Sequence, residues 1–396
     1  MKRVRVVTLV LALVVLFAAF SVQPVAAASR YDSLRSYMNE RWDPVRGGYS
    51  LTDDVVRVDE TYGAIVILDE LGILANRPPP VDITKVLNFT TKYQFLSGDQ
   101  DAPRYGGFME FLLGPVTAER THWGMVLWQT LKSQQGIPGT DQYEINETAL
   151  VHWVNKTQTE SGGFSAEPGL YPDIVSTYHA LATLEILDTI YGEDLNAWSY
   201  LANESLTLGF IEDCRYGNGF MLSPISDREG VTATAAALLA LEILDELATY
   251  PGLDAVKLWI LDRQVTDTPD PDFLGGFEET TLTEDPNLQT TYWAMKGLDL
   301  LQGVEELNET IVQDFILSCQ SADGAWALVP GIETGNLVYA SYAAECLDYL
   351  GNARAILSSS VDPETGGGFV VDWRALVIVG IIIVALVLAL LSIRMD

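Results

Sequence analysis

The stretch SGGFSAEPGLYPDIVSTYHALATLEILD, residues 161–188, carries the pattern that predicts the fold. It begins with a glycine pair and an aromatic residue, Gly162-Gly163-Phe164. It continues through Thr177-Tyr178 into a helix-forming segment rich in alanine and leucine. Similar segments recur along the chain, so this stretch indicates one unit of an internal repeat.

The glycine turn with its aromatic residue recurs about every 50 to 60 residues, a spacing typical of an array of one supersecondary unit. The copies are Gly47-Gly48-Tyr49, Gly106-Gly107-Phe108, Gly162-Gly163-Phe164, Asn218-Gly219-Phe220, Gly275-Gly276-Phe277 and Gly324-Ala325-Trp326.

A second motif, a small polar residue followed by a ring, keeps step with the first. Two motifs that hold the same register over six units indicate one structural repeat. The copies are Thr61-Tyr62, Thr177-Tyr178, Thr291-Tyr292 and Ser341-Tyr342, with His122-Trp123 in the second unit and Thr234-Ala235 in the fourth.

Each unit is expected to contain two helices of different character. The helix after the second motif is apolar on nearly all sides, as in residues 235–241, and such a helix is buried on most faces. The helix before the next glycine turn is amphipathic, as in residues 253–263 and 305–319. We therefore expect apolar helices inside and amphipathic helices outside.

This arrangement predicts the fold class. Six units with one inner and one outer helix each would form two concentric rings, an all-α α6/α6 toroid. An open solenoid is the alternative, but it would need polar caps on its terminal units, and the sequence shows none. Closure would place the first helix, expected at residues 31–41, beside the sixth unit, around residues 305–319 and 338–350.

The two ends of the chain indicate export and membrane anchoring. Residues 1–28 have the basic start, apolar run and small residues of a signal peptide, with an uncleaved anchor as the alternative. The toroid is expected over residues 29–352 and a juxtamembrane linker over 353–374. Residues 375–393 are apolar, uncharged and long enough for a transmembrane helix, and 394–396 would form a cytoplasmic tail. We therefore expect a single-pass protein of the cell membrane with an extracellular body.

Sequons for N-glycosylation agree with this placement. They lie within or at the edges of the amphipathic segments, and a glycan needs solvent, so they predict a glycoprotein whose outer helices are exposed. The candidate acceptors are Asn88, Asn146, Asn155, Asn203 and Asn308.

The charge of the chain limits its partners. It has 54 acidic residues against 23 basic ones and a formal net charge of −31. Such a field opposes a polyanion-binding surface, so no nucleic-acid partner is expected. The cysteines Cys214, Cys319 and Cys346 are odd in number and match no zinc-binding spacing, and their disulfide state stays open. No metal and no cofactor are predicted.

Two stretches resemble a known motif. Gln320-x-x-x-Gly324-x-Trp326 is similar to the Gln-Trp motif of squalene and hopene cyclases, and Gln158-x-x-x-Gly162-x-Phe164 is similar to its counterpart in protein prenyltransferases. The units, over about residues 29–351, resemble the repeats of the protein prenyltransferase β-subunit and squalene cyclase superfamily. The resemblance implies the α/α-toroid fold and leaves the activity open.

The resemblance also implies where the family's chemistry would lie. Protein prenyltransferases hold zinc with an Asp-x-Cys pair ahead of one inner helix and a His ahead of the next, and these positions fall on Asn287, Gln289 and Tyr339. These side chains are not a usable zinc ligand set. The Asp-x-Asp-Asp acid of squalene-type cyclases and the Cys-Gly-Glu-Gln thioester of complement-type toroids are absent from the sequence. None of these reactions is therefore expected.

The loops that enter the inner helices are expected to meet at the mouth of the ring. Their carboxylates and amides could cap helix starts, where free N–H groups are available. Alternatively, they could line a ligand site together with cationic side chains. The candidate residues are Asp59, Glu60, Arg120, His122, Asp173, Arg228, Glu229, Asn287 and Asn336.

These observations predict a membrane-anchored, extracellular toroid that binds a small molecule, a glycan or a protein at the ring mouth without zinc chemistry. The alternative is an exported enzyme, either a prenyltransferase or terpene-cyclase relative with altered chemistry or a carbohydrate-active α6/α6 enzyme with paired carboxylates. An aromatic tunnel would favour an isoprenoid or lipid, a polar cavity with a carboxylate pair would favour a sugar, and a filled centre would favour a protein.

Overall fold

The computed structural model describes residues 22–24, 27–51, 55–134, 142–282, 285–365 and 369–371. The chain divides into two compact units. The larger unit is Ser33–Leu357, and the smaller one combines the described residues up to Asp32 with those from Ser358 onward. The candidate site lies in the larger unit.

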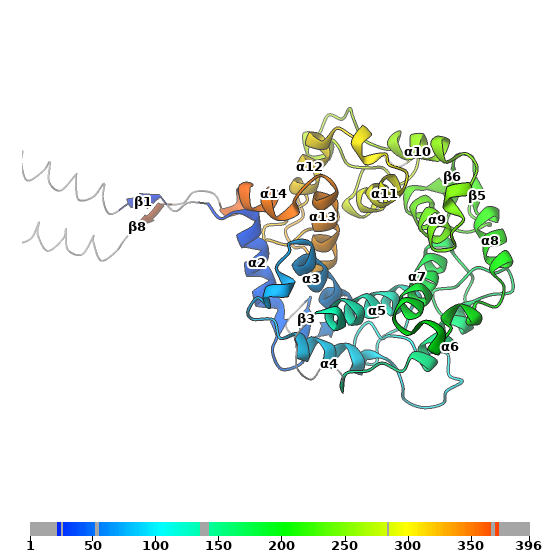
Figure 1. Cartoon of the computed structure of the whole chain (residues 1–396). Helices are drawn as coiled ribbons and strands as arrows, with labels where there is room; N and C mark the ends of the chain where they lie inside the picture. The colour runs from blue at the N-terminus through cyan, green and yellow to red at the C-terminus, as the bar shows by residue number, and fades with distance from the viewer. Residues whose placement is uncertain are drawn as a thin grey trace, which may run out of the picture. The chain divides into compact units, whose positions relative to one another are not determined.

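The larger unit has an inner layer of helices that follow one another around a ring (Figure 1). Each inner helix contacts the next one in the sequence, and the last contacts the first. They are mostly buried, as their apolar composition predicts. The inner helices are α3 (Val58–Glu70), α5 (Ala118–Ser133), α7 (Ile174–Tyr191), α9 (Val231–Ile243), α11 (Leu288–Leu300) and α13 (Leu337–Tyr349).

An outer layer of helices covers the inner one (Figure 1). Its members are α2 (Arg30–Arg41), α4 (Ile83–Tyr93), α6 (Glu147–Thr157), α8 (Glu204–Asp213), α10 (Leu253–Leu261), α12 (Glu309–Ser318) and, at the end of the unit, α14 (Ala353–Ser359). Short 3-10 helices lie at η1 (Leu74–Asn76), η3 (Gly192–Asp194), η4 (Ala197–Tyr200), η5 (Leu247–Thr249), η6 (Pro271–Phe273) and η7 (Val304–Glu306).

The prediction of a purely helical body needs a correction, because short antiparallel strands accompany the glycine turns. A turn folds the chain back on itself, so the residues on its two sides pair. At other turns single bridges take the place of strands, such as Gln158 with Phe164. The two three-stranded sheets are β2 (Trp42–Asp43), β3 (Gly48–Ser50) and β4 (Val56–Arg57), and β5 (Arg215–Tyr216), β6 (Gly219–Met221) and β7 (Glu229–Gly230).

A buried threonine joins most glycine turns to the inner helix that follows. Thr177 accepts a hydrogen bond from the backbone N–H of Phe164 at 3.0 Å and donates one to the carbonyl of Asp173 at 2.7 Å. The hydroxyl therefore satisfies a buried N–H group that has no ladder partner. We call this arrangement the threonine latch. The corresponding N–H contact is made by Thr61, Thr121, Thr234 and Thr291.

The threonine latch corrects the register predicted for the second unit. Thr121 accepts from the backbone N–H of Phe108 at 3.1 Å, so the pair there is Thr121-His122 and not His122-Trp123. His122 therefore occupies the position that Tyr62 and Tyr178 occupy in their own units.

The glycine pair is required because the next outer helix packs directly on the turn. Gly162 has a φ of +90°, which side chains with a Cβ rarely adopt. At Gly163 an added Cβ would come within 2.6 Å of the ring of Phe210 in α8. Phe164, which follows, is 1% exposed and fills the space between the layers.

The ring closes between its last and first inner helices. The backbone N–H of Leu337 in α13 donates to Glu60 Oε2 in α3 at 3.0 Å. The hydroxyl of Tyr37 in α2 donates to the carbonyl of Gly335 at 3.0 Å. Residues so distant in sequence meet here because the toroid is closed. The closed arrangement is thereby confirmed, and the open solenoid was the wrong alternative.

The smaller unit pairs the two ends of the chain. β1 (Val22–Pro24) lies antiparallel to β8 (Phe369–Val371), and Ser29 forms a bridge with Val361. The short 3-10 helix η8 (Pro363–Thr365) lies between Val361 and β8 in the sequence. Within the described ranges, no helix combines the length and the apolar character needed to cross a bilayer. Residues 1–21 of the predicted signal peptide, the predicted span 375–393 and the tail 394–396 lie outside the described residues.

Candidate functional site

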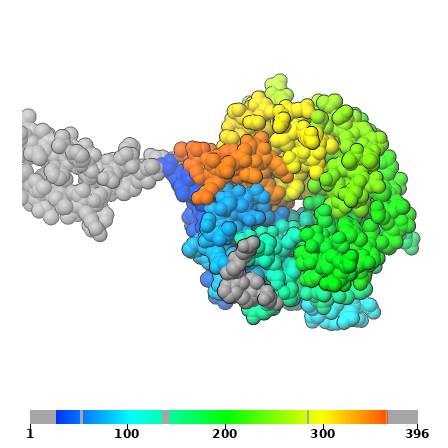
Figure 2. Space-filling model, in the orientation of Figure 1, coloured from blue at the N-terminus to red at the C-terminus, as the bar shows by residue number. Residues whose placement is uncertain are grey.

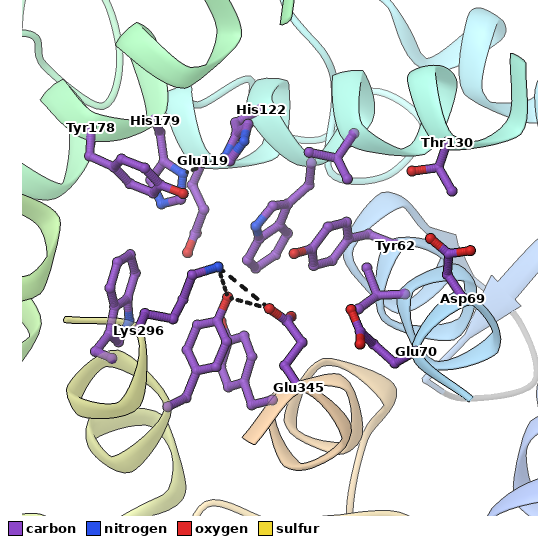
Figure 3. A pocket seen from close by; sticks show the side chains of 16 residues that line it. Tyr62, Asp69, Glu70, Glu119, His122, Thr130, Tyr178, His179, Lys296 and Glu345 are labelled. Atoms are coloured by element: carbon purple, nitrogen blue, oxygen red, sulfur yellow. Dashed lines mark hydrogen bonds and ion pairs between the residues drawn. The ribbon is translucent and has the colours of Figure 1, made fainter. Parts of the chain in front are cut away.

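A cavity of about 240 Å³ lies among the inner helices. Figure 2 shows that side chains fill most of the space that the ribbon leaves open in the ring. Residues of α3, α5, α7, α11 and α13 line the cavity, whereas no described residue of the alanine-rich α9 takes part. Figure 3 shows their side chains converging from these helices.

Aromatic rings form much of the cavity wall. Tyr62 stacks on Trp123 with ring centroids 5.0 Å apart and an interplanar angle of 5°, and Tyr292 stacks on Tyr342 at 4.1 Å and 12°. Tyr62, Tyr292 and Tyr342, like Tyr178, come directly after the small hydroxyl residue of the second motif. The repeat therefore places these side chains at equivalent positions of their inner helices. Stacked pairs stabilise by about 0.5–1.5 kcal/mol beyond their buried area, which favours a rigid wall.

One ion pair joins α11 and α13 inside the cavity. Lys296 Nζ lies 3.4 Å from Glu345 Oε2 and donates to the hydroxyl of Tyr292 at 3.1 Å. Glu345 Oε1 is buried and has no hydrogen-bond partner in the described structure. Burial lowers the pKa of Lys296, but Glu345 and the neighbouring tyrosines raise it more, so the net pKa lies well above its usual value. The ammonium group is therefore charged at neutral pH.

Two histidines meet across the cavity from Glu345 (Figure 3). His122 Nδ1 and His179 Nδ1 are 2.9 Å apart, so one of them carries a hydrogen and donates a hydrogen bond, which the other accepts. Burial lowers the pKa of His122 to about 3 and that of His179 well below its usual value, so both are neutral at pH 7. Consequently one ring has a bare Nε2 and the other an Nε2–H. Among the residues described, His179 Nε2 is buried and has no hydrogen-bond partner.

Carboxyl groups gather near the last turn of α3. Asp69 and Glu70 end this helix, and Glu345 lines the same cavity from α13 (Figure 3). Burial raises the pKa of Glu70 to about 7, with further increases from the negative charges of Glu345, Asp348 and Asp69. In the described part of the chain, no ion pair involves Asp69 or Glu70. This region therefore has an excess of negative charge.

Some of the residues predicted at the ring mouth lie together at the starts of α3 and α5. Asp59 pairs with Arg57 at 2.7 Å and lies 3.8 Å from Arg120. Glu60 is buried at the closure of the ring, where burial raises its pKa to about 7. Within the predicted set, His122 lines the central cavity.

Three further predicted residues cap inner helices. Their side-chain oxygens accept hydrogen bonds from backbone N–H groups, at 2.7 Å for Asp173, 2.9 Å for Asn287 and 2.8 Å for Asn336. Arg228 pairs with Asp227 on the surface at 2.8 Å, and Glu229 lies in β7. The capping interpretation therefore describes the first three, and ligand binding at the mouth stays a prediction.

Comparisons with known proteins relate this architecture to a family. The model of the prenyltransferase α/α-toroid domain matches residues 8–202 and 194–362. The chain belongs to this family. It is thus a prenyltransferase-like toroid, as the resemblance of its repeats implied.

Two curated relatives and one solved structure are similar to this toroid. The β subunit of geranylgeranyl transferase type 1 from Arabidopsis thaliana is 25% identical over 201 residues, 47% of this chain and 48% of the relative. The β subunit of the type 2 enzyme from Saccharomyces cerevisiae is 22% identical over 223 residues, 55% of this chain and 61% of the relative. The chain thus spans about half the length of the curated relatives it matches.

The solved structure is that of Candida albicans protein geranylgeranyltransferase-I complexed with GGPP. It is 17% identical with a TM-score of 0.57, and the match covers 78% of this chain and 87% of that one. At this identity the likeness shows the fold alone.

The residues at the family's expected zinc positions do not fit zinc. Asn287 uses its side-chain oxygen to cap α11, while Gln289 and Tyr339 offer an amide and a phenol. Zinc in proteins is held by thiolates, imidazoles and carboxylates. In the described ranges, no group of three His, Cys, Asp or Glu side chains is placed to hold a metal ion.

The prediction of a ligand site at the ring mouth missed the cavity, although the sequence shows charged residues at helical spacing from aromatic ones. Lys296 comes four residues after Tyr292, and Glu345 three residues after Tyr342, and such spacings place both residues of each pair on one face of a helix. A charged residue on the aromatic face of an otherwise apolar helix indicates a polar cavity. His179 lies next to Tyr178 and belongs to the same wall.

Proposed function

We propose that this prenyltransferase-family toroid is a membrane-anchored, extracellular binding protein that holds a small molecule in its central cavity without the family's zinc chemistry. The observation that carries the proposal is an aromatic cavity with two buried polar atoms, Glu345 Oε1 and His179 Nε2, that lack partners in the described structure. A buried polar atom without a partner costs about 1–3 kcal/mol, and a ligand would offset that cost.

The volume of the cavity limits the size of the ligand. Its 240 Å³ corresponds to roughly eight water molecules at ~30 Å³ each. Pockets for drug-sized ligands measure about 300–1,000 Å³. The cavity therefore holds roughly eight to ten non-hydrogen atoms of a ligand, and the rest of a larger ligand would extend beyond it.

The proposal includes six helix pairs, export and a C-terminal membrane anchor. Export and anchoring are supported by the composition of residues 1–28 and 375–393. The sequon side chains of Asn146, Asn203 and Asn308 are exposed at the starts of α6, α8 and α12, which favours glycosylation of the outer layer.

Native mass spectrometry of the full chain, purified in detergent from its host, tests the binding function. We expect a small molecule that stays bound and is released on denaturation. Thr130→Trp should fill the cavity and abolish retention, because Thr130 lines it. Thr266→Trp, the same change on an exposed loop, should retain the molecule.

The binding function would be wrong if the wild-type chain retained nothing and no compound of a charge-balanced fragment library raised its melting temperature. Equal retention by Thr130→Trp and wild type would place the ligand outside the cavity.

A second function, glycoside hydrolysis by paired carboxyl groups, is favoured by one observation. Glu70, with its pKa raised to about 7, lines the same cavity as Glu345, which is held by Lys296. A protonated and an ionised carboxyl group are the acid and base that such hydrolysis needs. Assays with nitrophenyl glycosides of single sugars should then show turnover that Glu70→Gln abolishes, and no turnover with any sugar would leave binding alone.

A further inference from the structure

The charges that line the cavity indicate the charge of its ligand. Four carboxyl groups, from Asp69, Glu70, Glu119 and Glu345, line it together with one ammonium group, that of Lys296. Glu119 has an arginine partner and Glu345 a lysine partner, so Asp69 and Glu70 are in excess. The two imidazoles are neutral. The cavity therefore attracts cations and repels anions.

The aromatic wall already holds cations over ring faces. Lys296 Nζ lies 5.0 Å from the ring centroid of Tyr292, and the guanidinium carbon of Arg120 lies 4.3 Å from that of Trp123. Such contacts stabilise by about 0.5–2 kcal/mol, with the larger values where water is excluded. A cationic ligand would meet the same kind of surface.

The unpartnered atoms indicate a ligand that donates hydrogen bonds. A carboxylate oxygen such as Glu345 Oε1 accepts only, and it is buried without a donor in the described structure. His179, 3% exposed, presents an Nε2 that also accepts when its Nδ1–H is donated to His122. A primary ammonium group has three N–H donors, whereas a quaternary ammonium or a carboxylate has none.

We infer that the cavity binds a small primary ammonium compound, with its NH3⁺ group beside the carboxyl groups of Glu345 and Glu70 and its carbon body between the aromatic walls. This inference rests on the proposed function, because it names the class of ligand that the cavity holds.

Binding of such a cation should depend on pH. Burial is the largest cause that raises the pKa of Glu70, and the charges of Glu345, Asp348 and Asp69 raise it further. The ammonium group of Lys296 lowers this pKa, and the resulting value is about 7. Above this pH Glu70 is ionised and attracts the ammonium group, and below it Glu70 is neutral. The affinity should therefore increase as the pH rises from 6 to 8.

Isothermal titration calorimetry of the full chain in detergent compares three probes that share one carbon skeleton. Phenethylammonium carries a positive head group, 2-phenylethanol a neutral one and phenylacetate a negative one. We expect phenethylammonium to bind at least about tenfold more tightly than the other two, with the stated increase in affinity between pH 6 and pH 8.

Three glutamate-to-glutamine variants locate the binding energy. Glu345→Gln and Glu70→Gln should each weaken phenethylammonium binding about tenfold, and Glu70→Gln should remove the pH dependence. Glu305→Gln removes the same charge from an exposed position and should bind as wild type does. Glu70 is only half-buried, so Glu70→Gln carries the test if a thermal melt shows that Glu345→Gln does not fold.

Three results would overturn the inference: the alcohol or phenylacetate binding as tightly as the ammonium, both glutamine variants binding as wild type does, or no binding of any probe. Retention of a neutral or anionic molecule in native mass spectrometry would then leave the proposed function standing. If the wild-type chain also retained nothing and bound no fragment, the proposed function would fall with the inference.

Discussion

Thr177 makes two hydrogen bonds in a part of the toroid that water does not reach. Its hydroxyl accepts from the N–H of Phe164 and donates to the carbonyl of Asp173, so one small side chain joins a turn to a helix. Serine or threonine can do this because a hydroxyl group is both donor and acceptor. In most units the first residue of the second motif therefore holds the turn and the second lines the cavity, whereas Ala235 of the fourth unit lies outside the cavity lining.

Replacing Thr177 with valine should destabilise the protein. Valine keeps the branched shape but cannot accept a hydrogen bond, so the N–H of Phe164 would be buried without a partner. We expect the free energy of unfolding, measured by urea denaturation, to fall by about 1–3 kcal/mol. Thr266→Val, on an exposed loop, should change it by less than about 0.5 kcal/mol. Equal stability of the two variants would contradict the role of the threonine latch.

The buried histidine pair should make stability depend on pH. His122 has its pKa lowered to about 3, while in the unfolded chain it takes up a proton near pH 6.5. A histidine whose folded pKa is lowered contributes stability that is lost as the pH falls through the unfolded value. Between pH 7 and pH 5, His122 should account for a loss of about 2 kcal/mol.

His122→Gln tests this contribution through the slope of unfolding free energy against pH. The variant should lose less stability than wild type between pH 7 and pH 5. Glu60 and Glu70 have pKa values raised to about 7, so they stabilise the folded protein as the pH falls, which is opposite to the effect of His122. Both glutamates are present in the wild type and in the variant, so the difference between the two slopes reports the effect of His122. Identical slopes would mean that His122 takes up its proton at the same pH in the folded and the unfolded chain.

At the scale of elements, α2 completes the ring. Its buried residues are Leu34, Tyr37 and Met38. Ser33 in the same helix lies close to Gly324, because a Cβ added to Gly324 would come within 2.7 Å of the Ser33 carbonyl oxygen. The first helix of the chain thus packs on the last glycine turn. Without α2, that turn and the start of α13 would expose apolar surface, which is an aggregation hazard.

Deleting residues 29–42 should therefore unfold or aggregate the toroid. Size-exclusion chromatography and thermal melting would show the loss of a monomer with a cooperative transition. Tyr37→Phe is the milder variant, and losing its hydrogen bond to Gly335 should cost about 0.5–1.5 kcal/mol. A truncated chain that stays monomeric and melts as wild type does would argue that closure through α2 is dispensable.

The elements were predictable from sequence to the extent that each depends on a local pattern. The glycine turns, the apolar inner helices and the first helix near residues 31–41 follow from composition and period, and the structure has them. The register at Thr121 was missed, because His122 and Trp123 both fit the motif and only the hydrogen bond to Phe108 distinguishes them. The Lys296–Glu345 pair was missed because it forms between two units, and a period within one unit does not show which side chains meet across the ring.

The whole molecule combines a strongly acidic chain with an outer layer that carries the sequons. Asn146 and Asn203 cap α6 and α8 through their side-chain oxygens, which leaves the amide nitrogens for a sugar. Asn155 differs, because its Nδ2 donates to the carbonyl of Tyr200 at 2.6 Å and is half-buried. The outer surface therefore offers acceptors of unequal accessibility.

Expression in a host with N-glycosylation machinery should produce sugars at Asn146, Asn203 and Asn308, and little or none at Asn155. Glycopeptide mass spectrometry, before and after treatment with peptide N-glycosidase, measures the occupancy of each site. A chain without sugar at any of the three exposed sites would count against the exported placement. Full occupancy of Asn155 would show that its hydrogen bond to Tyr200 does not protect it.

The closed ring and the paired chain ends together make the starting point of the chain arbitrary. The N–H of Asp362 donates to the carbonyl of Ala28 at 3.0 Å, and the N–H of Arg30 to that of Ser360 at 2.9 Å, so the polypeptide enters and leaves the smaller unit side by side. A circular permutant, with residues 29 and 361 joined by a short linker and new termini cut in the exposed loop at 266–270, would keep every turn, latch and cavity residue in the same order around the circle. Gene duplication could lengthen an open array by one unit at either end, but a circle has no end at which to add one.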